Sequence, residues 1–179
     1  MRRCPCERFW AAEADASLVD GGNDDYANLA SIVICCALSG CVTSAEAPSF
    51  ASAPVPEARS DVAVLYVFRG YAQPTALASH LDIDDKPAAS LLNQGFTWLY
   101  LKPGTHKFKH YWNLLSGMPT VEFSKALEGG QTYVFQMRGE VLIARADSLS
   151  TTAILEMELE EAKEHMASCC RYVPSRAKN

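Results

Sequence analysis

A series of short β-type segments between Val62 and Ala144 constrains the fold more than any other feature of this chain. The first segment, Val62–Phe68, is continuously apolar and rich in β-branched and aromatic residues, which is typical of a central strand covered on both faces. The later segments are His80–Asp84, Phe96–Leu101, His106–Trp112, Val121–Phe123, Thr132–Met137 and Val141–Ala144. Roughly six to eight short strands with short connections predict a mainly β protein, a small antiparallel β-sandwich.

Turn residues separate these segments. Asp84–Pro87 is a turn candidate, and Lys102–Thr105 has proline and glycine where a type II turn requires them. We expect the strands on either side of Lys102–Thr105 to form a hairpin. Gly129-Gly130 and Arg138–Glu140 are expected to turn the chain before and after Thr132–Met137.

The C-terminal part of the chain has a different pattern. The segment Ile154–Ser168 is rich in Glu, Leu, Met and Ala, and its apolar residues at helical spacing are Leu155, Leu159, Ala162 and Met166. This spacing predicts one amphipathic helix packed on the sandwich. The stretch Leu155–Leu159 also alternates, so a strand is the alternative for the first turn.

Upstream of the β segments, Leu29–Cys41 has the features of a secretory signal that ends in a lipid attachment site. Its apolar core, residues 29–38, is too short to span a hydrocarbon layer of about 30 Å but has the length of a signal-peptide core. Leu38-Ser39-Gly40-Cys41 resembles the bacterial lipobox, in which a branched apolar residue and two small residues precede an obligatory cysteine. We expect cleavage between Gly40 and Cys41 and lipidation of the Cys41 thiol. The alternative is a short buried helix in a cytosolic protein.

Lipid at Cys41 would hold the protein on a membrane without any other contact. Each buried methylene contributes about 0.8 kcal/mol, so two or three acyl chains anchor a protein stably. In the Gram-negative sorting pattern, aspartate directly after the cysteine favours the inner membrane. Val42 resembles the default case, so we expect the outer membrane, facing the periplasm.

The predicted leader, residues 1–40, departs from a usual signal peptide. The stretch Asp20–Tyr26 ahead of the apolar core is acidic, whereas positive charge is usual there, and the leader is long. We interpret this as a misassigned start codon, with residues 1 to about 20 not made in the cell. A weakly used signal is the alternative.

Residues 41–60 are expected to form the lipidated cysteine and a flexible linker. Ala, Ser, Pro and Glu dominate residues 42–60, which therefore bury too little apolar area to offset the entropy of ordering. Extended, this linker reaches at most roughly 60–65 Å, so the domain of residues 61–172 is expected to stand clear of the bilayer. In the tail, residues 173–179, Pro174 and the polar end 175–179 are expected to fray.

The charge of the chain argues against nucleic acid as its partner. The net charge is −5, and residues 41–179 carry thirteen basic and fifteen acidic residues. Nucleic-acid binding requires a basic stripe, whereas Lys107 and Lys109 form an ordinary solvated strand face. The expected partners are the membrane, through lipid on Cys41, and an unidentified envelope protein or glycan.

The positions of the cysteines also bear on disulfide formation and on metal binding. Cys4, Cys6, Cys35 and Cys36 lie upstream of the predicted cut, so only Cys169 and Cys170 remain in the domain. This is neither a disulfide framework nor a zinc-ligand spacing. Adjacent cysteines rarely bond to each other because the geometry strains the intervening peptide, so we expect two free thiols near a helix end, with a redox role as the alternative.

Several motifs together suggest a family. They are Val64–Arg69, Leu81–Lys86, Leu91–Phe96, Pro103–His106 and Gly129–Val134, followed by an acidic helix. In these features the stretch Asp61–Tyr172 resembles the bacterial domain-of-unknown-function family 2846, whose members are often small lipoproteins. Asp85 departs from the pattern, because a glycine is expected after the turn aspartate. The family has no established activity, so the resemblance implies no catalytic residue.

No group of residues predicts a catalytic site, a cofactor or a metal. His106 and His110 share one face of a strand but lie about 13 Å apart at roughly 3.3 Å per residue, too far for one metal. Asp82, Asp84 and Asp85 lack the spacing of a calcium loop, so we interpret them as turn residues.

The leading hypothesis is therefore a non-enzymatic, lipid-anchored envelope protein with a structural or interaction role. The first alternative is a small-ligand or glycan-binding module, which an exposed row of Trp98, Tyr100 and Trp112 would favour over core packing. The second alternative is an envelope hydrolase. It would require His106 or His110 beside an acid and a serine in a cleft.

Overall fold

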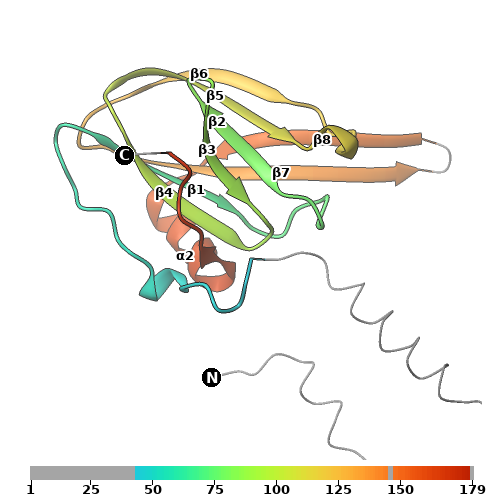
Figure 1. Cartoon of the computed structure of the whole chain (residues 1–179), viewed down its shortest axis with the longest axis horizontal. Coiled ribbons are helices and arrows are strands. Elements are labelled where there is room, and N and C mark those ends of the chain that lie inside the picture. The colour runs from blue at the N-terminus through green and yellow to red at the C-terminus, as the bar shows by residue number, and fades with distance from the viewer. Residues whose placement is uncertain (1–42, 145–146, 178–179) are drawn as a thin grey trace, which may run out of the picture. The chain divides into compact units, whose positions relative to one another are not determined.

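The structure, a computed structural model, describes residues 43–144 and 147–177 as two β-sheets and a C-terminal helix (Figure 1). The larger sheet has the strand order β8-β7-β1-β4-β9, and the smaller has the order β3-β2-β5-β6. The strands are β1 (Ala63–Arg69), β2 (Ser79–Ile83), β3 (Lys86–Leu91), β4 (Gly95–Leu101), β5 (Gly104–Trp112), β6 (Val121–Leu127), β7 (Thr132–Ala144), β8 (Asp147–Glu156) and β9 (Arg171–Tyr172). The helix is α2 (Leu159–Cys169), and two 3-10 turns are η2 (Phe50–Ser52) and η3 (Leu114–Ser116). Among these residues, no helix has the length and hydropathy needed to cross a membrane.

Strand β1 forms the centre of the fold, and every one of its residues is buried. Its side chains alternate between the two faces of the sheet. Leu65 and Val67 belong to a core that also contains Leu81 and Phe108 of the smaller sheet. This core stabilises the pairing of the two sheets because it removes the apolar surface of both from water.

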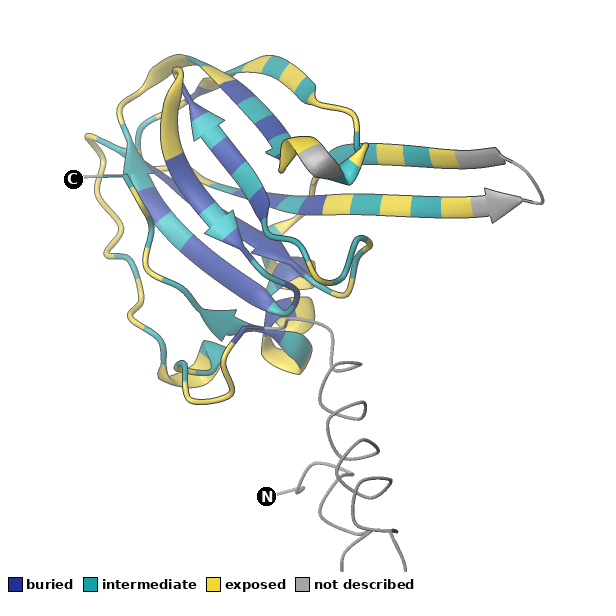
Figure 2. Cartoon of the chain, turned by 45° about the vertical axis from the view of Figure 1, so that its right-hand side comes forward, coloured by how far each residue is buried: buried dark blue, intermediate teal, exposed yellow. Residues whose placement is uncertain are grey.

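The opposite face of β1 packs against the helix. Val64, Tyr66 and Phe68 form a second core with Ala162 and Met166 of α2. Figure 2 shows the buried residues concentrated in the central strands between the two outer surfaces. The predicted β-sandwich with a C-terminal helix is confirmed, and β1 is the doubly covered strand that its apolar sequence indicated.

The larger sheet is mixed rather than purely antiparallel. β1 pairs antiparallel with β4 but parallel with β7, and β4 pairs parallel with β9. The predicted hairpin across Lys102–Thr105 is wrong, because β4 and β5 belong to different sheets. Gly104 has a φ of 138°, and the turn carries the chain from one layer of the sandwich to the other. Alternating apolar residues do not reveal which sheet a strand joins.

The predicted turn at Arg138–Glu140 is also wrong. β7 continues through these residues and pairs with β8 as far as Ala144. A Cβ at Gly139 would collide with the carbonyl oxygen of Gln73 and the indole of Trp112. The glycine therefore allows a close approach of chain segments inside a strand, which is a second established role of strand glycines.

The C-terminal helix begins later than Ile154. Strand β8 runs to Glu156 and α2 starts at Leu159, so the alternative of a strand for this first stretch is confirmed. Leu155 lies on β8, whereas Ala162 and Met166 are the buried helical residues. Acidic Glu160 and Glu161 occupy the first turn of α2, where their negative charges interact favourably with the helix dipole.

Residues 43–60 lie against the sandwich and do not form the free linker that their composition predicted. The Phe50 and Phe96 rings are 5.4 Å apart, Trp98 Nε1 donates to the Pro54 carbonyl at 2.7 Å, and the Tyr100 hydroxyl accepts the Glu57 N–H at 2.8 Å. The aromatic residues of β4 thus supply the apolar surface that this segment lacks. Composition alone cannot reveal such a surface, because it belongs to a distant part of the chain.

The tail is held in a similar way. Val173 N–H donates to the Phe96 carbonyl, and Arg176 N–H donates to the Ala88 carbonyl, at 2.8 and 2.9 Å. The Val173 bond continues the pairing of β9 with β4, and the Arg176 bond reaches β3 of the other sheet. The expected fraying is therefore wrong at Arg176.

Candidate functional site

The β7–β8 hairpin extends beyond the body of the sandwich, and we refer to residues 138–153 as the hairpin arm (Figure 2). β7 pairs with β1 only from Thr132 to Gln136, whereas its pairing with β8 continues to Ala144. Over the described residues, the arm is therefore a two-stranded ribbon with no third strand paired along its edges. Exposed and half-buried residues alternate along it, as expected for a ribbon with one face turned toward the body.

A groove of about 520 Å³ lies where the arm leaves the body. Its lining includes Tyr71, Gln73, Arg138, Glu140, Thr151 and Leu155. The lining thus combines one guanidinium, one carboxylate and one phenol with several apolar side chains, Leu142 among them. Such a lining suits the binding of a polar or amphipathic group.

Gln73 joins the wall of the groove to the arm. Its N–H donates to the Gly139 carbonyl at 3.1 Å, and its side-chain Oε1 accepts the Val141 N–H at 3.2 Å. Trp112 Nε1 donates to Thr152 Oγ1 at 3.1 Å from the smaller sheet. These bonds fix the base of the arm, Leu142 lines the outer end of the groove, and Leu149 pairs with it across the arm.

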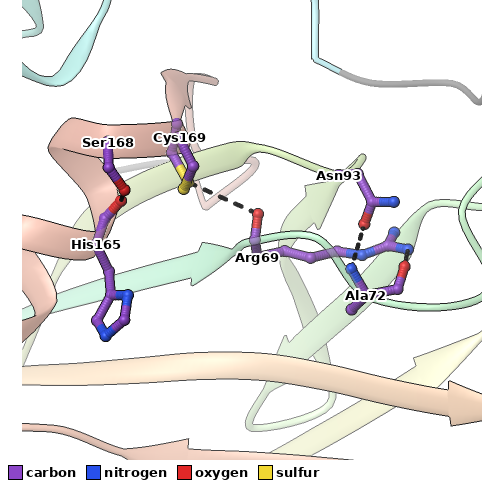
Figure 3. Close-up of a disulfide and its surroundings, with 7 residues drawn as sticks. Arg69, Ala72, Asn93, His165, Ser168 and Cys169 are labelled. Atoms are coloured by element: carbon purple, nitrogen blue, oxygen red, sulfur yellow. Dashed lines mark hydrogen bonds between the residues drawn. A yellow bond between two sulfur atoms is a disulfide. The ribbon is translucent and has the colours of Figure 1, made fainter.

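Arg69 organises the loop that supplies Tyr71 and Gln73. Its side chain is fully buried at the end of β1, and its guanidinium donates only to carbonyl oxygens among the hydrogen bonds of the described residues. The acceptors are Leu77, Leu91, Ala72 and Pro74. Figure 3 shows the side chain reaching from the strand toward Ala72 and Asn93. Because three of these carbonyls belong to one loop, Arg69 fixes the conformation of that loop.

The charge of Arg69 is stabilised by an aromatic ring as well as by carbonyl dipoles. Its guanidinium carbon lies 4.5 Å from the centre of the Trp112 ring. Burial lowers the pKa of Arg69 to about 10, so the group still carries its charge at neutral pH. From the sequence, Arg69 was identified only as the end of a strand. The feature that could have indicated a buried cation is a charged residue directly after a continuously apolar strand.

The three aromatic residues predicted as a ligand patch do not form an exposed row. Trp98 and Tyr100 are neighbours on β4, 5.4 Å apart between ring centres, and residues Pro54 and Glu57 cover them through hydrogen bonds. Trp112 lies on β5 in the other sheet and is 5% exposed. The prediction assumed that β4 and β5 were hairpin partners, and the separate sheets place these rings in different layers.

His110 lies beside a serine, but deep in the core. Its Nε2 is 2.6 Å from Ser79 Oγ, and both residues have no exposed surface. Burial lowers the pKa of His110 to about 4, so the imidazole is neutral at physiological pH. The contact between the imidazole and the hydroxyl resembles the one between histidine and serine in a hydrolytic triad. However, a substrate cannot reach a fully buried hydroxyl. It therefore does not meet the requirement set for a hydrolase.

His106 pairs with an acid at the opposite end of the same strand. Its Nδ1 is 2.6 Å from Asp84 Oδ2, and its Nε2 is 2.8 Å from the Lys102 carbonyl. Burial alone would lower the pKa of His106, but these two hydrogen bonds outweigh it and raise the pKa. The hydrogen bond from His106 also lowers the pKa of Asp84.

The predicted turn role of the aspartates is confirmed for Asp84 and Asp85. They have φ values of 50° and 60° and form the tight turn between β2 and β3. Asp82 instead lies within β2, where its Oδ1 accepts the Tyr111 hydroxyl at 3.3 Å. In the part of the chain that the structure describes, no three His, Cys, Asp or Glu side chains gather as metal ligands.

The expectation of two free thiols is wrong, since Cys169 and Cys170 form a disulfide. Cys169 ends α2 while Cys170 is already extended, so the backbone changes conformation between the two residues. Cys170 is 3% exposed, and its Sγ lies 3.8 Å from the Arg69 carbonyl oxygen (Figure 3). The disulfide therefore adjoins the end of β1 from which the Arg69 side chain enters the core.

The predicted cleavage and lipidation positions, Gly40 and Cys41, lie outside the described residues. The first described residue, Thr43, is 8% exposed, and its N–H donates to the Asn93 carbonyl at 2.8 Å. No protein family, curated protein or solved structure matches the chain.

Proposed function

We propose that this chain is a lipid-anchored protein of the bacterial cell envelope, held by lipid on Cys41, that acts by contacting another envelope component. The observation that carries the proposal is the apolar segment Leu29–Leu38 followed by Leu38-Ser39-Gly40-Cys41, directly ahead of the folded domain. The resemblance to the domain-of-unknown-function family 2846 is part of the same proposal. The outer membrane, facing the periplasm, is its proposed location.

Two structural features support this reading. The described residues 43–144 and 147–177 form a folded β-sandwich that lies entirely downstream of the proposed cut. The disulfide between Cys169 and Cys170 is a second support, because disulfides persist in the periplasm and are rare in the cytosol.

The anchor is tested by expressing wild type and Cys41→Ala and comparing their partition into a detergent phase. Wild type should enter the detergent phase, and mass spectrometry should find an acylated cysteine at its N-terminus. Cys41→Ala should stay in the aqueous phase or keep its leader. Cys36→Ala is the matched control, since its cysteine lies upstream of the cut and its removal should change neither result.

The anchor proposal fails if Cys41→Ala remains in the detergent phase at the size of the wild-type protein. An unmodified thiol at position 41 in the mature wild type would contradict it as well. Either result would return the segment Leu29–Leu38 to the alternative of a buried helix.

A small-ligand role is a second candidate, favoured by the groove beside the hairpin arm rather than by the aromatic strands. Arg138 and Glu140 place opposite charges two residues apart on β7, and Tyr71 at the edge of the groove is 75% exposed. Cell-wall glycan fragments are suitable probes. Their binding should perturb the amide NMR signals of Tyr71 and Glu140, and Tyr71→Ala should weaken it. Shifts confined to the outer aromatic residues of β4 would instead place the site there.

A further inference from the structure

We propose that the hairpin arm makes a second contact with the bilayer, through Leu142 and Leu149 in the headgroup region. This inference rests on the lipid anchor at Cys41. It differs from the proposed function in one respect. The lipid anchor by itself requires no protein surface in contact with the membrane. The arm provides such a surface and thereby orients the domain.

The anchor point is close to one end of the sandwich. Thr43 is buried and hydrogen-bonded to Asn93, in the connection between β3 and β4. Cys41 is two residues earlier, so its Cα lies at most about 7.6 Å from that of Thr43, at 3.80 Å per peptide unit. Because residues 43–60 are not a free spacer, lipid at Cys41 would keep this end of the domain at the membrane surface.

The hairpin arm leaves the body from that same end. β4 begins at Gly95, which pairs with Arg69, the last residue of β1. β7 runs parallel to β1, pairs Gln136 with Phe68, and then continues past the end of β1. Leu142 is six residues beyond Gln136, or roughly 20 Å at 3.3 Å per residue. The arm thus extends from the end of the sandwich at which Thr43 is bonded.

The exposed face of the arm changes from polar to apolar toward its tip. Arg138 pairs with Ala153 and Glu140 with Thr151 near the body, and Leu142 pairs with Leu149 farther out. Leu142 is 51% and Leu149 is 61% exposed. Single exposed leucines are ordinary, but a cross-strand pair at the free part of a ribbon presents one continuous apolar surface.

Other exposed apolar residues lie at this end of the sandwich. Tyr71 follows β1, and Leu114 follows β5 and is 96% exposed. With the two arm leucines, they account for four of the six large apolar residues that are exposed in the described ranges. Tyrosine is enriched at membrane interfaces because its ring is apolar and its hydroxyl is polar. Arg145 and Asp147 follow Leu142 in the sequence, which favours contact with headgroups over burial in hydrocarbon.

The contact is tested with a fluorophore at position 149. Leu149→Cys in the full chain is processed in cells, purified, labelled with an environment-sensitive dye and reconstituted into phosphatidylethanolamine and phosphatidylglycerol vesicles. After cleavage and lipidation, the engineered thiol is the one that remains free, since Cys169 and Cys170 are bonded to each other. Thr105→Cys, at the opposite end of β4 and β5, is the matched control.

The label at position 149 should emit at shorter wavelength on vesicles and be quenched by brominated lipid, while the label at position 105 should show neither effect. Leu142→Ser in this labelled protein should reduce the quenching at position 149, because it removes the leucine that remains beside the label. Equal quenching with Leu142→Ser would mean that the dye inserts by itself, which overturns the proposal. A shift that follows protein concentration without vesicles would overturn it in favour of a second copy of the chain.

Flotation of the same samples separates the two proposals. Protein that floats with vesicles but shows no quenching at position 149 keeps the anchor and loses the arm contact. Protein that does not float with vesicles lacks the lipid at Cys41, and both proposals then fail. Quenching together with flotation supports both.

Discussion

Arg69 lies beneath the ring of Trp112, with its guanidinium carbon 4.5 Å from the ring centre, and this contact joins the ends of the two sheets. Arg69 belongs to β1 of the larger sheet and Trp112 to β5 of the smaller one. The same guanidinium fixes the loop that forms one wall of the groove, through hydrogen bonds to Ala72 and Pro74. One buried cation therefore connects the packing of the sandwich to the shape of its candidate site.

Arg69→Met should lower the free energy of unfolding by about 3–5 kcal/mol, because it leaves several buried carbonyl groups without a donor. Arg69→Lys should also be destabilising, since an ammonium lacks the planar geometry that reaches several acceptors and the Trp112 ring. Urea unfolding of the purified protein measures both. Arg59→Met is the control, because the Arg59 side chain lies on the surface, where it pairs with exposed Asp61 and contacts the Tyr100 ring. A loss below about 1 kcal/mol for Arg69→Met would contradict the assigned role.

Stability should depend on pH through His110. Its folded-state pKa of about 4 lies below the ordinary value of 6.5, so the unfolded chain binds a proton that the folded chain does not. This destabilisation disappears as the pH rises above 6.5 and grows as the pH falls toward 4, reaching about 2–3 kcal/mol near pH 4.5. His110→Gln keeps a partner for Ser79 without titrating. The cost of this substitution should therefore be larger at pH 7.5 than at pH 4.5, as measured by urea unfolding at the two pH values.

The surface pair of His106 and Asp84 should act in the opposite direction. The raised pKa of His106 means that its contribution is fully present below pH 6.5 and is lost as the pH rises through the folded-state value. The lowered pKa of Asp84 means that its contribution is present above its ordinary pKa of 3.8 and is lost at more acidic pH. His106→Gln should cost about 0.5–1 kcal/mol near pH 5.5 and less at pH 9, since Asp84 is half exposed.

A double-mutant cycle isolates this pair from other titrating groups. Asp84→Asn retains an oxygen that accepts the Lys107 N–H, so it removes the charge with little change in the turn. In the His106→Gln background it should have little further effect at pH 5.5. An additive effect of the two substitutions would mean that the residues do not interact in solution.

The packing of residues 43–60 is tested by Phe50→Ala. Removing the ring that lies against Phe96 should weaken the docked segment by about 1–2 kcal/mol, which corresponds to roughly a tenfold increase in its opening. Amide hydrogen exchange at Thr43, whose N–H is bonded to Asn93, reports this opening. Val55→Ala is the control, because Val55 is 77% exposed and should leave exchange unchanged. Rapid exchange at Thr43 in the wild type would show that the segment is a free linker after all.

The local patterns were sufficient for most elements of the fold. The unbroken apolar run of β1 indicated a doubly covered strand, and Asp84-Asp85 indicated a turn, because both depend on residues adjacent in the sequence. The assignment of β4 and β5 to separate sheets could not be predicted, since a strand with the same alternation fits either sheet. The turn predicted at Gly139 was wrong for a related reason. A glycine that admits a distant carbonyl looks the same in sequence as a glycine in a turn.

The candidate site was harder to predict from the sequence than the fold, because it depends on contacts between residues far apart in the chain. Gln73, Arg138 and Thr151 come from separate parts of the chain, and no spacing between them signals that they line one groove. The aromatic residues were visible in the sequence, but their exposure was not, because Pro54 and Glu57 cover Trp98 and Tyr100 from more than forty residues away.

The sequence by itself determined the strand-rich core, the acidic C-terminal helix and the candidate lipid site, because propensity, alternation and a short motif are properties of neighbouring residues. Only the tertiary structure decided how those parts face one another. It docked residues 43–60, extended β7 and β8 into an arm, and placed Thr43 and that arm at one end of the sandwich. Burial and register bring together residues far apart in the chain, and these contacts arise only when the chain folds.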